Sequence, residues 1–218
     1  MRAHRAFVAG LAGIAVLAAA IAAPAAAQSW ESPTFFSPGP HDDIGLYGVK
    51  FEGTDDLGFH AIWRQSGNIN LGVRAGIGPG EVNWLVGAEF YGPLRILGPD
   101  SPVLVSWIVG AGAMFLDDRF DNSVTALRIP AGVSLGLNTG SSTVSIVPYV
   151  HPRVAFDLLA VSNDDEEDTD SEFNVDLDLG ADVTLGDRFV LRAGFTLSES
   201  NTFGAGIAYR IPRRVVVR

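Results

Sequence analysis

Hydrophobic and polar side chains alternate strictly over Asn174–Leu185, which reads N-V-D-L-D-L-G-A-D-V-T-L. The odd-numbered positions carry valine, leucine and alanine, and the even-numbered positions carry asparagine, aspartate, glycine and threonine. A β-strand directs alternate side chains to opposite faces, whereas a helix would spread the aspartates around its circumference. The stretch therefore predicts a strand with one apolar face and one wet or ion-paired face.

The same period of two recurs along the chain, and no helical period appears after the amino-terminal region. We predict about ten antiparallel strands, at 44–52, 57–65, 69–77, 82–91, 103–115, 125–137, 144–158, 174–185, 189–197 and 202–211. The alternation is least regular in the first strand. There Tyr47, Val49 and Phe51 form the better apolar face, which leaves Lys50 on the polar face.

The first 27 residues have the composition of a cleaved signal peptide. Arg2 and Arg5 precede an apolar run over 7–21, and the alanines at 25–27 supply the small residues of a cleavage site. An uncleaved membrane anchor is the alternative. The sequence predicts an exported protein.

Charge and cysteine content exclude several classes of function. Removing Arg2 and Arg5 with the leader leaves 13 of the 15 basic residues against 25 acidic ones, a net charge of −12. Such a chain has no basic face for nucleic acid. It contains no cysteine, so disulfides and thiolate metal sites are excluded. The remaining roughly 190 residues suit one domain, and no later apolar run is long enough for a transmembrane helix.

Two architectures show such alternation: a soluble β-barrel or sandwich with an apolar interior, and a membrane barrel with a wet interior. The polar face favours the membrane barrel, because it is rich in glycine, arginine and aspartate, and Lys50 is the only lysine. Glycine weakens a solvent-facing strand but leaves room for long side chains inside a narrow barrel. Aromatic residues such as Trp84 and Trp107 lie on the apolar face, which we expect to meet lipid.

These features resemble the small outer-membrane β-barrel proteins of Gram-negative bacteria, in the broad OmpA-like class. The resemblance rests on the leader, the alternating strands and the rhythm of short and long loops. It implies an all-β, closed, antiparallel up-and-down barrel of about ten strands, with eight as the alternative count. The implied organisation is a signal peptide over 1–27, a periplasmic segment leading into the barrel over 28–42, the barrel over 43–211 and a tail over 212–218.

Two features depart from that class. The class usually ends its last strand on a C-terminal aromatic residue, whereas here Pro212 and further residues follow Tyr209. Pro130, Pro148 and Pro152 also fall inside predicted strands, where each removes a ladder donor. A β-bulge and an error in the predicted register are the two explanations.

Charged residues on the polar faces predict an ion-paired interior. The predicted lumenal network is Arg64, Arg74, Glu89, Arg128, Arg153, Asp157, Asp176, Asp178, Asp182, Arg192 and Arg210. Lys50 is also predicted to point into the lumen. Near balance of charge favours ion pairs, since an unpaired charge in a narrow lumen is costly. An ion-selective pore lining is the alternative. A three-residue turn at 186–188 sets Leu185 opposite Phe189, and therefore predicts a pair between Asp182 and Arg192.

No set of residues predicts catalysis or a cofactor. His151, Arg153 and Asp157 share a face, but Ser145 would lie about 20 Å from Asp157 along the strand. The predicted long connection 159–173 carries an acidic cluster of Asp164, Asp165, Glu166, Glu167, Asp168, Asp170 and Glu172. Their spacing does not match a calcium loop. We predict a solvated extracellular loop, with divalent bridging to lipopolysaccharide as the alternative.

The sequence thus predicts a monomeric outer-membrane barrel with a filled lumen and a structural or surface-interaction role. Its expected partners are outer-membrane lipid, lipopolysaccharide and the barrel-assembly machinery. A narrow porin-like channel for small solutes is the second interpretation, and a soluble periplasmic β-barrel binding an apolar ligand is the third. The turns at 66–68, 138–142 and 186–187 are expected in the periplasm, with 117–122 and 159–173 outside.

Overall fold

The computed structural model describes residues 32–51, 57–78, 83–98, 101–117, 123–140, 144–162, 167–199 and 201–212. The predicted leader over 1–27 and the tail beyond Pro212 lie outside them. The strands are β1 (Asp43–Phe51), β2 (Leu57–Gln65), β3 (Leu71–Ile77), β4 (Asn83–Pro93), β5 (Val103–Asp117), β6 (Ser123–Leu137), β7 (Thr139–Gly140), β8 (Val144–Ser162), β9 (Glu167–Leu185), β10 (Phe189–Leu197) and β11 (Thr202–Arg210). In the described part of the chain, no helix is long and apolar enough to span a membrane.

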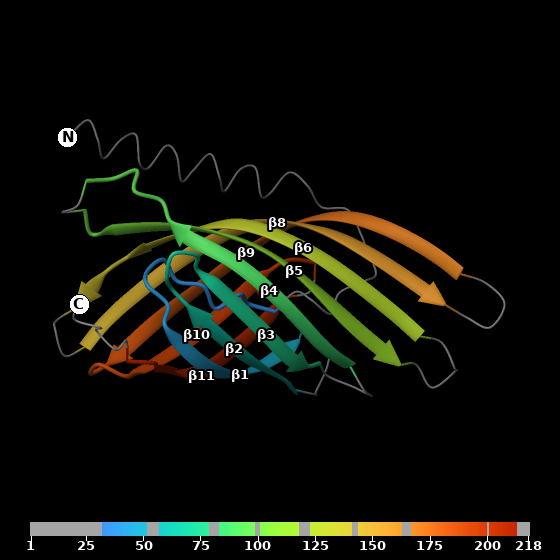
Figure 1. Ribbon diagram of the computed structural model, residues 1–218, viewed down its shortest axis with the longest axis horizontal. Coiled ribbons are helices and arrows are strands. Elements are labelled where there is room, and N and C mark those ends of the chain that lie inside the picture. Colours follow the sequence, from blue (N-terminus) through green and yellow to red (C-terminus); the bar gives the residue numbers. More distant parts are fainter. Residues whose placement is uncertain are drawn as a thin grey trace.

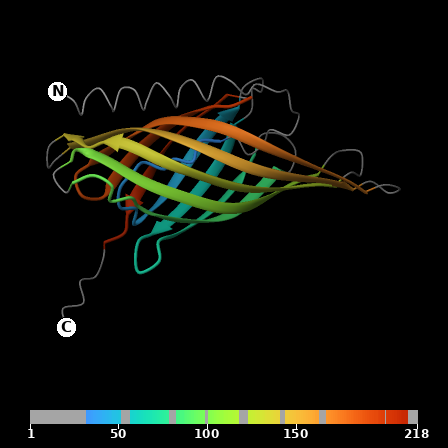
Figure 2. The ribbon, with the colours of Figure 1, turned by 90° about the horizontal axis from the view of Figure 1, so that it is seen from above.

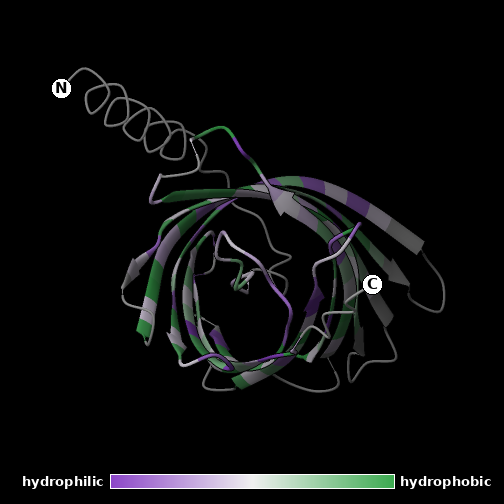
Figure 3. Cartoon of the chain, turned by 60° about the vertical axis from the view of Figure 1, so that its left-hand side comes forward, coloured by the Kyte–Doolittle hydropathy of each residue, from purple (hydrophilic) through white to green (hydrophobic). Residues whose placement is uncertain are grey.

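The ten long strands close into an antiparallel barrel (Figures 1 and 2). Each long strand pairs with its neighbours in sequence, β6 pairs with β8 across the two-residue β7, and β1 pairs with β11. These pairings confirm the predicted closed up-and-down barrel of ten strands. Figure 3 looks into the ring and shows a stretch of chain running inside it.

The two ends of the barrel differ. At one end β1 begins and β11 finishes, and we call this the terminal end. Because the strands alternate in direction, the connections from β2 to β3, β6 to β8 and β9 to β10 lie there too. At the opposite end the hairpin of β8 and β9 extends beyond β10 and β11 (Figure 1), and we call this the projecting end.

The three strand prolines leave the register unchanged. Along β5–β6, β6–β8 and β8–β9 the residue numbers of facing residues keep one constant sum on both sides of each proline. Pro148 faces Ala181 and Pro152 faces Leu177 within that register, and Pro130 faces Ala155. Neither a bulge nor a register error therefore accounts for these prolines.

The apolar faces of β2–β6 and β8–β11 point outward, as predicted. Trp84 is 49% exposed and Trp107 is 37% exposed in the isolated chain. On the same two strands, Glu89 of β4 and Ser106 of β5 have the opposite phase, point inward and are buried. The outward set also includes Phe59, Val73, Phe90, Val109, Ile129, Val154, Leu191, Phe203 and Ile207. An outer surface this apolar is suited to lipid.

The predicted faces of β1 are wrong. Tyr47 and Val49 point inward and are buried, Leu46 is 66% exposed, and Lys50 is exposed on the outer face rather than lumenal. Tyr47 points inward because it contacts a residue from outside the strand, which the alternation within β1 does not indicate. The Tyr47 ring stacks on Phe35 inside the barrel, with ring centroids 4.2 Å apart.

The predicted long connection over 159–173 is also wrong. β8 continues to Ser162, which faces Glu167 at the start of β9. The acidic residues Glu167, Asp168, Asp170 and Glu172 therefore belong to a strand, whereas Asp164, Asp165 and Glu166 lie outside the described residues. Carboxylates are uncommon in strands because strands are usually half buried. The first part of β9 has no partner strand on the side where β10 ends, and Thr169, Asp170 and Ser171 are exposed, so this reason does not apply there.

Candidate functional site: the filled lumen

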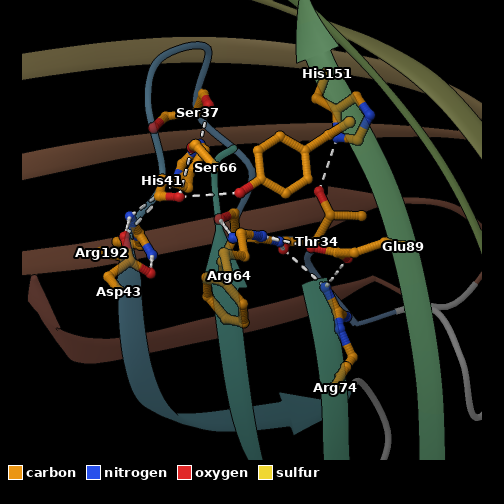
Figure 4. Close-up of polar contacts among 12 residues, drawn as sticks. Thr34, Ser37, His41, Asp43, Arg64, Ser66, Arg74, Glu89, His151 and Arg192 are labelled. Carbon is orange, nitrogen blue, oxygen red and sulfur yellow. Dashed lines mark hydrogen bonds and ion pairs between the residues drawn. The ribbon is translucent and has the colours of Figure 1, made fainter. Parts of the chain in front are cut away.

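Residues 32–41 lie inside the barrel, and we call them the lumenal segment. The sequence predicted a periplasmic segment leading into the barrel over 28–42, whereas residues 32–41 lie in the lumen; residues 28–31 are not among those described. Ser32 lies beside His60 of β2, with 3.5 Å between Oγ and Nδ1. At its other end, His41 lies beside Asp43 at the terminal end, with 3.7 Å between Nδ1 and Oδ2. The segment therefore runs through the lumen antiparallel to β1, and Figure 4 shows its polar contacts.

The composition of the lumenal segment explains how it can be buried. It contains no aspartate, glutamate, lysine or arginine, and its prolines at 33, 38 and 40 have no N–H group that would need an acceptor. Its carbonyl groups accept hydrogen bonds from the barrel wall. Arg64 donates to the carbonyls of Phe35 at 2.7 Å and Thr34 at 2.8 Å, and Ser134 donates to that of Phe36 at 2.7 Å.

The backbone of the segment has an energetically unfavourable conformation at Phe35. Phe35 has a φ of 49°, in the left-handed region that a bulky residue rarely adopts. Such a conformation costs on the order of 1–3 kcal/mol and persists only where the surroundings fix it. Here the Tyr47 ring stacks on the Phe35 ring and Arg64 binds the Phe35 carbonyl.

Glycine residues make room for the segment, which extends their predicted role of accommodating long side chains. A Cβ atom on Gly204 would lie 2.5 Å from the Phe35 ring, and one on Gly136 would lie 2.8 Å from the Pro38 ring. A Cβ on Gly72 would lie 2.6 Å from the Glu89 side chain. A larger residue at Gly204 or Gly136 would displace the lumenal segment, and one at Gly72 would displace the Glu89 side chain.

A first cluster joins Arg64, Arg74 and Glu89. The Nε atom of Arg64 donates to Glu89, and Arg74 lies 4.0 Å from the same carboxylate. Two guanidinium groups thus share one carboxylate, and Thr34 supplies a carbonyl acceptor to both. The guanidinium of Arg64 also lies over the Phe36 ring, 5.3 Å from its centroid, in a cation–π contact.

A second cluster surrounds Asp178 in β9. Its carboxylate accepts hydrogen bonds from the Thr34 amide at 3.0 Å, the Thr34 hydroxyl at 2.7 Å and the Thr196 hydroxyl at 2.8 Å. The Thr34 hydroxyl has a single hydrogen, which it gives to Asp178. His151 Nδ1, 2.7 Å from the same Oγ1, must therefore carry a hydrogen and donate it to Thr34.

Arginine–carboxylate pairs continue this cluster toward β6 and β8. Arg153 lies 3.3 Å from Asp176 and 3.4 Å from Asp178. Arg128 pairs with Asp176 and lies 3.5 Å from Asp157. The side chains of both arginines are buried. Their positive charges are therefore stabilised by the neighbouring carboxylates rather than by water.

A third cluster centres on Arg192 in β10. Arg192 faces Asp182 in the register predicted from the turn, and its Nε donates to the carboxylate at 2.9 Å. Its two terminal nitrogens also donate hydrogen bonds to the Asp43 carboxylate, at 3.0 and 2.7 Å. One of them donates to the Tyr47 hydroxyl at 2.9 Å as well. Arg192 is therefore bound to two carboxylates rather than one.

The lumenal segment completes this third cluster. Ser37 donates to Asp182 at 2.7 Å. The Nε2 of His41 donates to the Ser37 carbonyl at 2.7 Å, so its Nδ1 accepts from Arg192 at 3.2 Å. The tautomer of His41 is fixed by these two partners.

Most residues of the predicted lumenal network thus lie in these three clusters. Arg210 does not: it is half-buried at the terminal end and donates to Thr184 at 3.1 Å. Sequence reasoning missed Asp43, because the wrong phase of β1 directed it outward. It also missed Thr34, Ser37 and His41, which lie in a stretch without any period.

The free space beside Thr34 is small. A cavity of about 50 Å³ lies between Thr34 and the wall formed by β4, β5, β6 and β8. It has room for a few water molecules. A larger cavity of about 750 Å³ lies at the terminal end, between Pro40 and the facing ends of β4 and β5, including Tyr91 and Ser106. In the part of the chain that the structure describes, no three histidine, aspartate or glutamate side chains are grouped as metal ligands.

Comparison with known proteins identifies a family. The model of the family described as outer membrane protein beta-barrel domain matches residues 12–210. The N-terminal β-barrel domain of Pseudomonas aeruginosa OprF is 12% identical, over 78% of this chain and 98% of that one, with a TM-score of 0.38. Neisserial surface protein A is 12% identical, over 78% of this chain and 94% of that one, with a TM-score of 0.39. Ail of Yersinia pestis is 14% identical, over 79% of this chain and 100% of that one, with a TM-score of 0.32. No curated protein matches the sequence.

Proposed function

Because this chain belongs to the family of outer membrane protein beta-barrel domains, we propose that it is an outer-membrane barrel closed by its own amino-terminal segment, with a structural or surface-interaction role. The observation that carries the proposal is the uncharged lumenal segment bound to the arginines and aspartates of the wall. The proposal assigns no catalysis to the protein.

The contacts of the segment explain why it should stay in place. Its departure would remove carbonyl acceptors from Arg64 and Arg74 and hydroxyl donors from Asp178 and Asp182. A hydrogen bond to a charged group contributes about 1.5–3 kcal/mol, so losing several at once is strongly unfavourable. This reasoning favours a closed barrel over a narrow porin-like channel.

Conductance distinguishes the two functions. Purified protein inserted into planar bilayers should give no stable conductance steps, and liposomes carrying it should not swell in small sugars. The double variant Thr34→Ala with Ser37→Ala removes two hydroxyl donors from the segment, and we expect it to open intermittently. Thr139→Ala, at an exposed position, is the matched control. Stable conductance by the unchanged protein would instead support the porin-like channel.

We further propose that the signal peptide is removed, that the terminal end faces the periplasm, and that the barrel-assembly machinery inserts the chain among outer-membrane lipid and lipopolysaccharide. The chain has no cysteine, so single cysteines can report the orientation. A membrane-impermeant maleimide on intact cells should label Thr169→Cys at the projecting end and spare Asp187→Cys in the turn before β10. The reverse result would invert the topology.

A further inference from the structure

The projecting part of β9 has one open edge. β9 pairs with β8 from Glu167 to Leu185, but it pairs with β10 only from Leu177 onward. Among the described residues, no strand pairs with the other side of Glu167–Asp176, and we call this stretch the open edge. In Figure 1 the hairpin extends past the ends of β10 and β11.

The backbone of the open edge presents ladder positions that no strand of the described residues occupies. In an antiparallel strand the N–H and C=O of alternate residues point to the same side. The N–H of Ser171 contacts the carboxylate of its neighbour Asp170 at 2.8 Å, so it points away from β8. The backbone groups of Thr169, Phe173 and Val175 then point the same way. Such an edge is a template for an added strand.

The side chains around the open edge are acidic. No lysine, arginine or histidine occurs between Arg153 and Arg188 in the sequence. Asp170 is exposed and Glu172 half-buried. In this projecting part the pKa of Glu172 is raised, first by partial burial and then by repulsion from Glu199, Asp157 and Asp170. Asp176, at the inner end of the edge, pairs with Arg153. Toward the tip of the hairpin, Asp170 and Glu172 therefore concentrate negative charge.

We propose that the open edge is a docking site for an extended basic strand of a partner protein. The partner strand adds to β9 through backbone hydrogen bonds and places lysine or arginine side chains against Asp170 and Glu172. A second copy of this chain does not fit, because it would bring the same carboxylates to the same edge. This inference deepens the surface-interaction role proposed above and rests on it.

A model strand tests the docking. The probe is a fluorescent ten-residue peptide that alternates lysine and threonine, and the control probe alternates glutamate and threonine. Binding to the purified full-length protein in detergent is followed by anisotropy. The lysine peptide should bind saturably, and its affinity should fall at high salt. The glutamate peptide should bind at least tenfold more weakly than the lysine peptide. Equal binding of the two probes would overturn the proposal.

Two variants separate backbone addition from simple charge attraction. Ser171→Pro removes an N–H that points to the open side, a position where an edge strand tolerates proline, and Ser171→Ala keeps it. We expect at least tenfold weaker binding for Ser171→Pro only. Asp170→Lys with Glu172→Lys should reverse the preference toward the glutamate peptide. Binding unchanged in Ser171→Pro, or unchanged preference in the double lysine variant, would refute the docking mode.

Folding and self-association are measured on the same samples. A shift in gel mobility on boiling shows that each variant is folded, and the double lysine variant decides the question if Ser171→Pro does not fold. Sedimentation should show a monomer, since a dimer that Ser171→Pro abolishes would make a second copy the occupant and overturn the proposal. Peptide binding by purified protein is independent of membrane orientation, so the cysteine labelling described above can fail without affecting this result.

Discussion

Replacing Arg192 by alanine tests how the lumen is held together. Arg192 is 3% exposed, and its guanidinium binds both Asp43 and Asp182, which are 1% and 5% exposed. The substitution leaves two buried carboxylates without their cation. Breaking a buried ion pair by removing one partner costs about 3–5 kcal/mol, and with two carboxylates affected we expect about 5 kcal/mol.

Removing Asp182 should have a smaller effect. In Asp182→Ala the guanidinium of Arg192 keeps both of its contacts with Asp43, so its charge remains paired. The losses are one hydrogen bond to a charged group and the acceptor of the Ser37 hydroxyl. We expect a destabilisation of about 2 kcal/mol, the range for one charge-assisted hydrogen bond. An isolated pair of Asp182 and Arg192 would give more equal effects.

Urea unfolding in lipid vesicles or detergent, followed by tryptophan fluorescence, measures these free energies. The double variant should cost about as much as Arg192→Ala alone, rather than the sum of the single changes, because the two residues share one interaction. Arg188→Ala in the exposed turn is the matched control, expected within about 0.5 kcal/mol of the unchanged protein. Equal effects of the single variants would refute the central role of Arg192, and additive effects would refute the pair.

Two further predictions concern the inner and outer faces of the barrel. Gly204→Ala should destabilise the protein by about 1–3 kcal/mol, because its Cβ would meet the Phe35 ring, and Phe35→Leu should recover part of the loss. Gly48→Ala is the control, since its Cβ would meet nothing within 4 Å; equal urea midpoints for the two alanine variants would contradict the fit of the lumenal segment. Brominated lipid should quench the fluorescence of Trp84 and Trp107 in single-tryptophan variants of the folded protein. Unquenched emission would show that their face does not meet lipid.

Much of the barrel could be predicted because the relevant signals are local. The period of two assigns side chains to faces within each strand, and the turn at 186–188 sets the register that brings Asp182 opposite Arg192. The glycine-rich polar face predicted a narrow interior crossed by long side chains, and Arg64 and Glu89 occupy it in this way. Each of these inferences uses residues on one strand or one hairpin.

The limits of sequence reasoning appear where a residue's partner is distant in the chain. The acidic residues of β9 lie on an open edge because their hairpin projects beyond the shorter strands β10 and β11, and strand length relative to neighbours is a property of the whole sheet. Tyr47 of β1 points inward because its ring stacks on Phe35. Neither feature can be recognised from the stretch that carries it.

The sequence by itself determined the alternation, the strands and the charged inner face of this protein, because a strand's side chains sort by position alone. Only closure of the ring decided what fills the lumen. It brings Thr34 to Asp178, 144 residues away, and Arg192 to Asp43, 149 residues away. An uncharged stretch without a period becomes a buried segment only when surrounding strands supply donors for its carbonyls and acceptors for its hydroxyls, and those groups come together only in the tertiary structure.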